Sequence, residues 1–370
     1  MTNTNLKINK DSILAFEYFT SSGDRNPCII SEAESLILSL IEELKGLDVF
    51  LLIHKSYKYL VNDINYITPI FIEEPLEIWL EENSNLFKRA IFIAAENDMN
   101  LYKLTNILEE NNVKVYGSST NATMISSDKF KTYDELYGVV AQPRTFKLKI
   151  DSKGYWLRAL RNLYEKWQSE DPLSQLKIII KPISGVDCED IKIINNLDEI
   201  SYDLEEIFPI NSRILIQDFI EGIDVSVSLI SDGKKAIPLS LNKQEIELDN
   251  DNQKYLGGCL PFESNFKQEA YEIAIKSVES ISGIKGFVGV DLILNNGNLD
   301  LNDVYLLEVN SRFTTPYVAL QKIANFNIAQ SIIDLLDDKI KINDLENQIS
   351  LNGKAIFKKE GNFLKLEVIK

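Results

Sequence analysis

The pattern that decides the fold lies in GVDL at residues 289–292 and LEVN at residues 307–310, where one acidic residue interrupts each apolar run. Both stretches are typical of strands, and the interrupting residues are Asp291 and Glu308. Because side chains alternate along a strand, Glu308 and Asn310 share a face, and a neighbouring strand can place Asp291 beside them. Two carboxylates and an amide oxygen on one face form an all-oxygen site suited to Mg²⁺. The alternative is the solvated outer face of an antiparallel strand.

Two lysines favour the ligand site over the solvated strand face. Lys181 ends the apolar run at residues 178–180, and a lysine that ends a buried strand is costly unless it meets an anion. Lys129 opens a predicted helix directly after Ser127 and Asp128. An ordinary solvated lysine remains the alternative at both positions, and it is the simpler interpretation of Lys129.

A third feature is the segment at residues 216–222, which leaves a predicted strand and turns at Gly222. Such a strand edge can offer backbone carbonyl and amide groups to an adenine. Asp224 follows two residues after the turn, where a carboxylate can meet ribose hydroxyls. Neither of the commonest phosphate cradles is present, because the P-loop pattern is absent and no well-placed G-x-G-x-x-G follows a predicted strand.

The first 118 residues alternate between strands and helices, which predicts a small parallel sheet covered on both faces. The predicted strands are residues 13–18, 49–53, 89–95 and 113–116. One helix is predicted from a capping box at Ser31 and Glu34 to Gly46, a second over residues 75–87, and a third with its cap at Asn97.

Beyond residue 118 the strands are closely spaced and rich in Ile and Val, which favours antiparallel sheets. The predicted strands are residues 177–181, 192–194, 213–219, 225–230, 287–294 and 304–309. A long helix is predicted over residues 266–282, a turn at 295–298, and a terminal hairpin over 349–369 that turns at 360–362. Residues 143–172 are predicted as a polar, aromatic-spotted region.

Composition limits the classes of function that the chain can have. The 370 residues carry 39 Lys and Arg against 56 Asp and Glu, a formal net charge of −17, so a broad nucleic-acid surface is disfavoured. His54 is the one histidine, which removes most imidazole metal sites. Cys28, Cys188 and Cys259 are far apart and indicate reduced thiols. No apolar run is long enough for a membrane helix, and Glu17 interrupts the short N-terminal one, so we expect a cytoplasmic protein.

Five elements in order, over about residues 118–320, make the chain resemble the ATP-grasp superfamily. They are Ser127-Asp128-Lys129, Lys181-Pro182 with the loop to Glu189, Gln217 to Gly222 with Asp224, Asp291, and Glu308-Val309-Asn310-Ser311-Arg312. The resemblance implies an α/β plus α+β architecture in three parts, with ATP held between two subdomains behind an N-terminal domain. The implied parts are a parallel α/β domain at 1–118, a central lid region at 119–222 and a catalytic subdomain with an antiparallel sheet at 223–370.

The resemblance also implies the roles of individual residues. Lys129 and Lys181 would contact phosphates. Within the segment that begins at Gln217, Asp218 and Ile220 would hold adenine through their backbones, and Asp224 would meet the ribose.

The metal and catalytic residues are implied in the same way. Asp291, Glu308 and Asn310 would ligate two Mg²⁺ (or Mn²⁺) ions. Arg312, together with Lys181, would stabilise the transferring phosphoryl group or an acyl phosphate.

Within the superfamily the chain is most similar to the tyramine–glutamate ligases of methanofuran biosynthesis. The similarity rests on Phe16-Glu17-Tyr18 with Gly23, Ala95-Glu96, the Lys181-Pro182-x-x-Gly185-x-x-Cys188-Glu189 loop, Tyr255-x-Gly257-Gly258-x-x-Pro261 and Asn310-x-Arg312-x-Thr314-Thr315. Two positions depart from the pattern: the phosphate loop lacks a second glycine near Asp187, and Ser311 stands where the family has proline.

This similarity implies an ADP-forming ligase that joins the γ-carboxylate of glutamate to tyramine through an acyl phosphate. Its partners are then small-molecule carboxylates and amines, with neither nucleic acid nor membrane, and a homodimer is compatible with it. Glu221, Thr314 and Tyr317 are further substrate-side candidates, although Tyr317 can equally be packing. The alternatives are another ATP-grasp ligase with a different substrate pair, a carboxylase-type enzyme, or a nucleotide-binding protein without catalysis.

Overall fold

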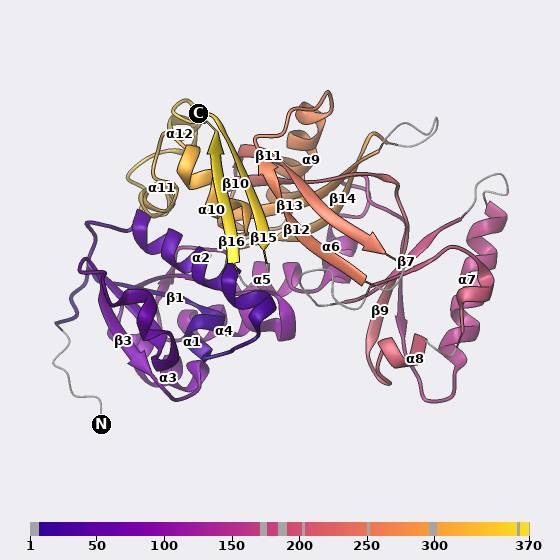
Figure 1. The fold of residues 1–370 in the computed structure, drawn as a ribbon, viewed down its shortest axis with the longest axis horizontal. Helices are drawn as coiled ribbons and strands as arrows, with labels where there is room; N and C mark the ends of the chain where they lie inside the picture. The colour runs from indigo at the N-terminus through magenta and orange to yellow at the C-terminus, as the bar shows by residue number, and fades with distance from the viewer. Residues whose placement is uncertain are drawn as a thin grey trace.

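The computed structural model describes residues 7–170, 176–183, 191–201, 204–249, 252–295, 302–360 and 363–369. The chain folds around three sheets, one from each successive part of the sequence (Figure 1). This arrangement confirms the predicted combination of a parallel α/β domain with antiparallel α+β parts. None of the described helices has the length and apolar composition that a membrane span requires.

The N-terminal sheet has five parallel strands in the order β3-β2-β1-β4-β5. Its strands are β1 (Ile13–Glu17), β2 (Val49–His54), β3 (Thr68–Ile72), β4 (Arg89–Ile93) and β5 (Lys114–Val115). The helices around it are α1 (Tyr18–Ser22), α2 (Pro27–Glu43), α3 (Leu76–Asn83) and α4 (Asn100–Glu110). Alternate strand residues pack on α2 at one face and on α3 and α4 at the other, so both faces are covered as predicted.

Two details of the N-terminal prediction were wrong. The capping box at Ser31 is not a helix start, because α2 begins four residues earlier at Pro27, whose fixed φ suits the first turn of a helix. Asn97 is not the cap of α4, which begins at Asn100 after a short 3₁₀ turn. The strand β3 was not predicted, because Pro69 and its half-exposed neighbours obscure the apolar run.

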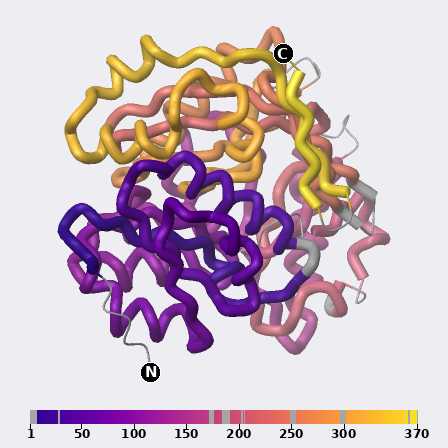
Figure 2. The backbone as a smooth tube through the Cα atoms, turned by 60° about the vertical axis from the view of Figure 1, so that its left-hand side comes forward, coloured from indigo at the N-terminus to yellow at the C-terminus, as the bar shows by residue number. Residues whose placement is uncertain are grey.

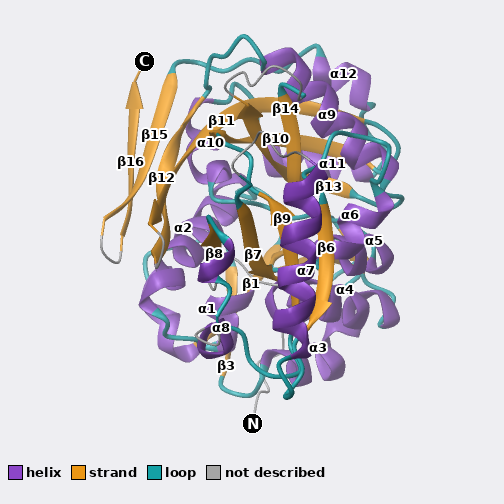
Figure 3. Cartoon of the chain, turned by 90° about the vertical axis from the view of Figure 1, so that its right-hand side faces the viewer, coloured by secondary structure: helices purple, strands orange, loops and turns teal. Residues whose placement is uncertain are grey.

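The central sheet is antiparallel, in the order β6-β9-β7-β8, and has its own core (Figure 3). Its elements are β6 (Thr145–Lys149), α7 (Tyr155–Glu170), β7 (Ile178–Pro182), β8 (Lys192–Ile194), α8 (Leu204–Ile207) and β9 (Arg213–Asp218). Residues 143–172, predicted only as a polar region, therefore contain a strand and a helix. Trp156, Tyr164 and Trp167 are buried on one face of α7. Phe146 of β6 and Tyr155 at the start of α7 are exposed.

The third sheet has seven antiparallel strands in the order β14-β13-β10-β11-β12-β15-β16. They are β10 (Gly222–Asp232), β11 (Ala236–Asp249), β12 (Asn252–Leu260), β13 (Lys285–Asn295), β14 (Val304–Asn310), β15 (Lys354–Glu360) and β16 (Phe363–Ile369). Its helices are α9 (Lys267–Ser280), α10 (Pro316–Ile323), α11 (Ile328–Leu336) and α12 (Ile342–Glu346). The terminal hairpin is confirmed, whereas its turn at 361–362 lies outside the described residues.

The N-terminal and C-terminal parts share one hydrophobic core, in which α2 packs with α10, α11 and β15 (Figure 2). At its centre the buried Glu43 carboxylate accepts hydrogen bonds from Tyr317 Oη at 2.7 Å and from the amides of Ile328 and Ala329. The two short helices α5 (Thr120–Ser126) and α6 (Lys129–Glu135) pack on the seven-stranded sheet. We keep residues 118 and 222 as proposed domain boundaries, since β5 ends just before the first and β10 begins at the second.

Candidate active site

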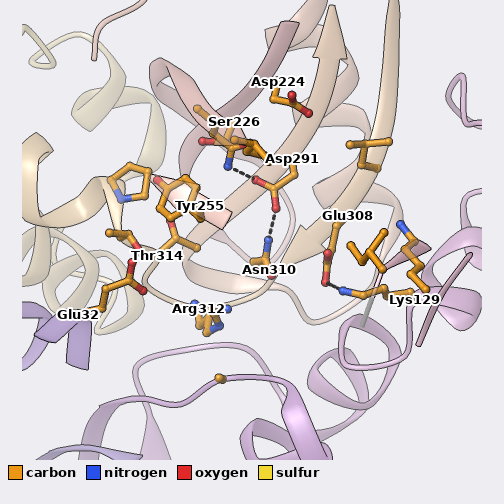
Figure 4. Close-up of a pocket in the computed structure, with 18 of the residues that line it drawn as sticks. Glu32, Lys129, Asp224, Ser226, Tyr255, Asp291, Glu308, Asn310, Arg312 and Thr314 are labelled. Carbon is orange, nitrogen blue, oxygen red and sulfur yellow. Dashed lines mark hydrogen bonds and ion pairs between the residues drawn. The ribbon is translucent and has the colours of Figure 1, made fainter. Parts of the chain in front are cut away.

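A cavity of about 310 Å³ lies where the three parts of the chain meet. All ten residues predicted for the site line it, and they come from both parts of the sequence after residue 118. Figure 4 labels several of them, including Lys129, Asp291 and Arg312. They are Lys129, Lys181, Gln217, Asp218, Ile220, Asp224, Asp291, Glu308, Asn310 and Arg312.

The acidic pair is formed by the register of β13 and β14, which places Asp291 directly opposite Glu308. Asn310 Nδ2 donates to Asp291 Oδ2 at 2.8 Å, and Gln244 Nε2 from β11 donates to Asp291 Oδ1 at 3.0 Å. Burial, together with the neighbouring Glu308 charge, raises the pKa of Asp291 to about 7. These side chains therefore face the cavity and not the solvated outer face of the sheet.

This donor set fits a divalent cation. Desolvation and the neighbouring Glu308 charge disfavour the charged form of Asp291, and a cation between the two carboxylates would stabilise it. Asn310 is 7% exposed and adds an amide oxygen next to Asp291. Among the described residues no group of three or more His, Cys, Asp and Glu side chains could hold a metal, so the amide is needed to complete the set.

Lys129 and Lys181 supply positive charge from two different elements. Lys129 is the first residue of α6, whose cap Asp128 accepts from the amides of Phe130 and Lys131, and its Nζ pairs with Glu308 Oε1. Lys181 lies in β7 and is only 8% exposed. The structure thus brings both cations to the cavity, with Lys129 on the acidic pair itself.

The segment that follows β9 forms another wall of the cavity. Arg144 holds the Asp218 carboxylate through two hydrogen bonds, at 2.9 and 3.0 Å, and its guanidinium stacks 4.3 Å from the Trp167 ring centre. The Asp218 amide donates to Arg144 O at 3.0 Å, so that amide is already engaged. Gln217 Nε2 donates to Thr145 Oγ1 at 2.7 Å, which further fixes the strand.

Asp224 lies in β10, on the strand that also carries Ser226 opposite Asp291 (Figure 4). Burial raises the pKa of the Asp224 carboxyl above its usual range. The carboxylate is therefore desolvated at the cavity wall, where a hydroxyl donor would stabilise its charged form.

Arg312 joins this site to the N-terminal domain. Its Nε donates to Glu96 Oε2 at 2.7 Å, and Nη1 donates to Phe313 O at 3.2 Å. Glu96 follows β4 and is 2% exposed, and burial raises the pKa of its carboxyl despite the adjacent guanidinium. The sequence had pointed to Glu96 only through the family resemblance.

Part of the cavity is formed by the N-terminal domain, and we call it the N-terminal wall. It consists of Glu17, Phe19, Ile29, Glu32, Ala33, Leu36, Ile93 and Ala95. None of these residues was predicted as a site residue, and the sequence pointed to Glu17 and Ala95 only through the family resemblance. The four wall residues from α2 recur at helical spacing. The same spacing is typical of any helix that faces a core, so it does not indicate a binding site.

Of the three other substrate-side candidates, one lines the cavity and two do not. Thr314 lines the cavity beside Tyr255 and Glu32 (Figure 4). Glu221 instead pairs with Lys177 and is not among the lining residues, and Tyr317 is buried packing against Phe287 and Phe313. Gly185, Asp187, Cys188 and Glu189 of the expected phosphate loop lie outside the described residues.

Comparison with known proteins agrees with this geometry. An ATP-grasp domain model matches residues 126–316. The chain is 32% identical to the tyramine–L-glutamate ligase of Methanocaldococcus fervens, over 84% of this chain and 89% of that protein. It is 30% identical to the enzyme of the same name from Methanocaldococcus jannaschii, over 87% and 88%. A crystal structure of an ATP-grasp superfamily protein from Archaeoglobus fulgidus has the same fold, with a TM-score of 0.67, 22% identity, and coverage of 97% and 99%.

The chain therefore belongs to the ATP-grasp family, as the sequence predicted. Enzymes of this family use ATP and a divalent metal. Within that family the chain is an enzyme of the ATP-dependent carbon–nitrogen ligases.

Proposed function

We propose that the chain joins the γ-carboxylate of glutamate to the amine of tyramine, with ATP converted to ADP and phosphate. The substrate pair is suggested by the names of the two relatives at 32% and 30% identity, both of which are matched over most of their length. The reaction class is supported by the cavity, which gathers the Asp291–Glu308 pair and three cationic side chains from separate parts of the chain.

The observation that carries the proposal is the Asp291–Glu308 pair with Asn310 beside it and Lys129 on Glu308. We propose that Asp291, Glu308 and Asn310 hold two Mg²⁺ or Mn²⁺ ions, which would neutralise part of the triphosphate charge. Binding of the metals would also release Lys129 from Glu308 toward the phosphates. The bound cations would offset the repulsion between the Asp291 and Glu308 carboxylates.

The nucleotide is proposed to lie along the wall formed by the central sheet. Lys129 and Lys181 would contact the phosphates, and Asp224 would accept a hydrogen bond from the ribose. Adenine would be held along Gln217 to Ile220. Because the Asp218 amide already donates to Arg144 O, we expect adenine to contact the Asp218 carbonyl and the backbone of Ile220.

The proposed chemistry has two steps. A carboxylate oxygen of glutamate attacks the γ-phosphorus, the bond to the β,γ-bridging oxygen breaks, and ADP leaves. The amine nitrogen then attacks the acyl phosphate carbon, phosphate leaves with the bonding electrons, and the nitrogen loses a proton. Lys181 and Arg312 would stabilise charge on the transferring group, because preorganised cations act strongly in a cavity from which water is excluded.

The test is a phosphate-release assay in which amino acids are screened against amines, with mass spectrometry of the products. We expect release to require glutamate and tyramine together and the product to be their amide. If another carboxylate–amine pair supports release and glutamate with tyramine does not, the substrate assignment is wrong. Release that depends on bicarbonate would identify a carboxylase instead.

Two further parts of the proposal concern the protein as a whole. Since ATP and glutamate are substrates found inside cells, we place the reaction in the cytoplasm. We also propose a homodimer, which light scattering of the purified chain tests directly by its molar mass.

A further inference from the structure

Glu17 is a buried carboxylate at the edge of the cavity that the proposed reaction leaves without a role. It ends β1, is 2% exposed and lines the N-terminal wall. Its oxygens accept from Phe19 N at 3.0 Å, Thr20 N at 2.8 Å and Thr20 Oγ1 at 2.9 Å. Within the part of the chain that the structure describes, no lysine or arginine forms an ion pair with it. A cation at this point would therefore complete the site.

The surface beside Glu17 is apolar. Ile29, Ala33 and Leu36 point into the cavity from successive turns of α2, and Phe19 adds an aromatic ring from α1. Tyr255 of β12 lines the cavity as well. A ligand bound here would bury an apolar or aromatic body against these side chains.

The second acidic residue of the wall is already matched by a cation. Glu32 of α2 pairs with Lys359 of β15 at 2.9 Å, and Lys359 Nζ lies 5.3 Å from the Tyr255 ring centre. The C-terminal hairpin thus contributes the neighbouring positive charge, and that charge is held by Glu32. A ligand carboxylate in this region would lie among Glu17, Glu32 and apolar groups, which is unfavourable.

Arg312 lies at the junction between this region and the acidic pair. Its guanidinium charge acts on both Glu17 and Glu96, and it is one of the residues that line the same cavity. A ligand nitrogen bound by Glu17 would therefore lie on the side of the cavity that faces the proposed phosphoryl-transfer centre.

We propose that the N-terminal wall is the amine subsite, in which Glu17 binds the ammonium group and Phe19, Ile29, Ala33 and Leu36 hold its aromatic body. This inference rests on the proposed function and adds its specificity: the subsite selects arylalkylamines without a carboxylate over the corresponding amino acids. Glu17 is thus a substrate-binding residue of the amine, distinct from the residues proposed for ATP and metal.

The test measures equilibrium binding by calorimetry with three probes: tyramine, tyrosine, and the alcohol that has a hydroxyl in place of the tyramine amine. We expect the full-length protein to bind tyramine at least about tenfold more tightly than either of the others, because only tyramine offers a cation without a carboxylate. Glu17→Gln should weaken tyramine binding by about tenfold or more and leave MgADP binding unchanged. The matched control is Glu34→Gln on α2, whose carboxylate accepts from Tyr59 Oη and is not among the residues that line the cavity.

A second variant keeps the proposal testable if Glu17→Gln fails to fold. Ala33→Phe places a large ring in the proposed subsite, and we expect it to abolish tyramine binding with MgADP binding intact. The subsite would be overturned if either variant bound tyramine as tightly as the wild type does. It would also be overturned if the wild type bound tyrosine as tightly as tyramine, or bound no tyramine. The proposed function fails separately, when no amine supports phosphate release with any carboxylate.

Discussion

The acidic pair and the N-terminal wall line the same cavity, and they differ in the neighbours that their carboxylates have. At the acidic pair every described charge has a neighbour: Lys129 on Glu308, and Asn310 with Gln244 on Asp291. At the wall, Glu17 is held by backbone amides and one hydroxyl, surrounded by apolar groups from α1 and α2. The acidic pair thus brings several charged and polar groups into mutual contact, whereas the wall presents Glu17 without an ion pair among apolar groups in the described part of the chain.

The largest effect should come from the acidic pair. Glu308→Ala removes a proposed metal ligand, and we expect phosphate release to fall by about 1,000-fold or more because several kcal/mol of charge stabilisation is lost. Stability should change little, since the variant also removes repulsion on the desolvated Asp291. Steady-state kinetics and denaturant unfolding measure the two effects. Glu263→Ala, at an exposed ion pair with Lys267, is the control, and activity near wild type in Glu308→Ala would refute the metal assignment.

Arg312 also lines this cavity, and its replacement should affect both activity and stability. Arg312→Lys keeps the charge but loses the planar donor set that meets Glu96 at 2.7 Å. We expect kcat to fall by about 100-fold, and the free energy of unfolding to fall by about 1–3 kcal/mol because Glu96 is left buried with a poorer partner. The two losses are read from a phosphate-release assay and a urea titration. An unchanged kcat would remove Arg312 from the catalytic group.

The pH dependence of stability distinguishes Glu17 from an ordinary surface acid. Burial raises its pKa from 4.5 to about 7, so between these values the folded state binds more protons than the unfolded state. Stability therefore falls as pH rises through this window, by up to about 3 kcal/mol for this group. Glu17→Gln has no such titration, so the difference in unfolding free energy between wild type and variant should shift in favour of the variant from pH 4.5 to pH 7. A difference that is constant over this range would show that Glu17 is not desolvated.

The smallest effect is expected at the outer edge of the nucleotide wall. Arg144→Met removes both hydrogen bonds to Asp218 and keeps an apolar contact with Trp167. We expect KM for ATP to rise by about three- to tenfold with kcat almost unchanged, because a side chain that only orients the strand is lost. Steady-state assays with ATP as the varied substrate measure this, and a fall in kcat without a rise in KM would contradict the positioning role.

The predicted site residues and the missed ones differ in how visible they are in the sequence. Asp291 and Lys181 are charged residues within or at the end of apolar strands, so each can be recognised from its local sequence alone. Both line the cavity. Ile29, Ala33 and Leu36 have the spacing of any core-facing helix, so nothing in the sequence separates a cavity wall from packing. Gln244 lies in β11, which was not predicted, and it reaches Asp291 only through the pairing of β10 with both β11 and β13.

Short stretches of sequence were enough to predict the class of fold and the acidic and basic residues that line the cavity, because local periodicity and charges in apolar strands are properties of short segments. Which distant residues come into contact depends on the packing of the whole chain. This packing placed Glu96 on Arg312, Lys359 on Glu32 and Glu17 beside the apolar face of α2, and these contacts join residues far apart in the chain. Such contacts depend on how whole sheets pack against one another, and no local pattern encodes that packing.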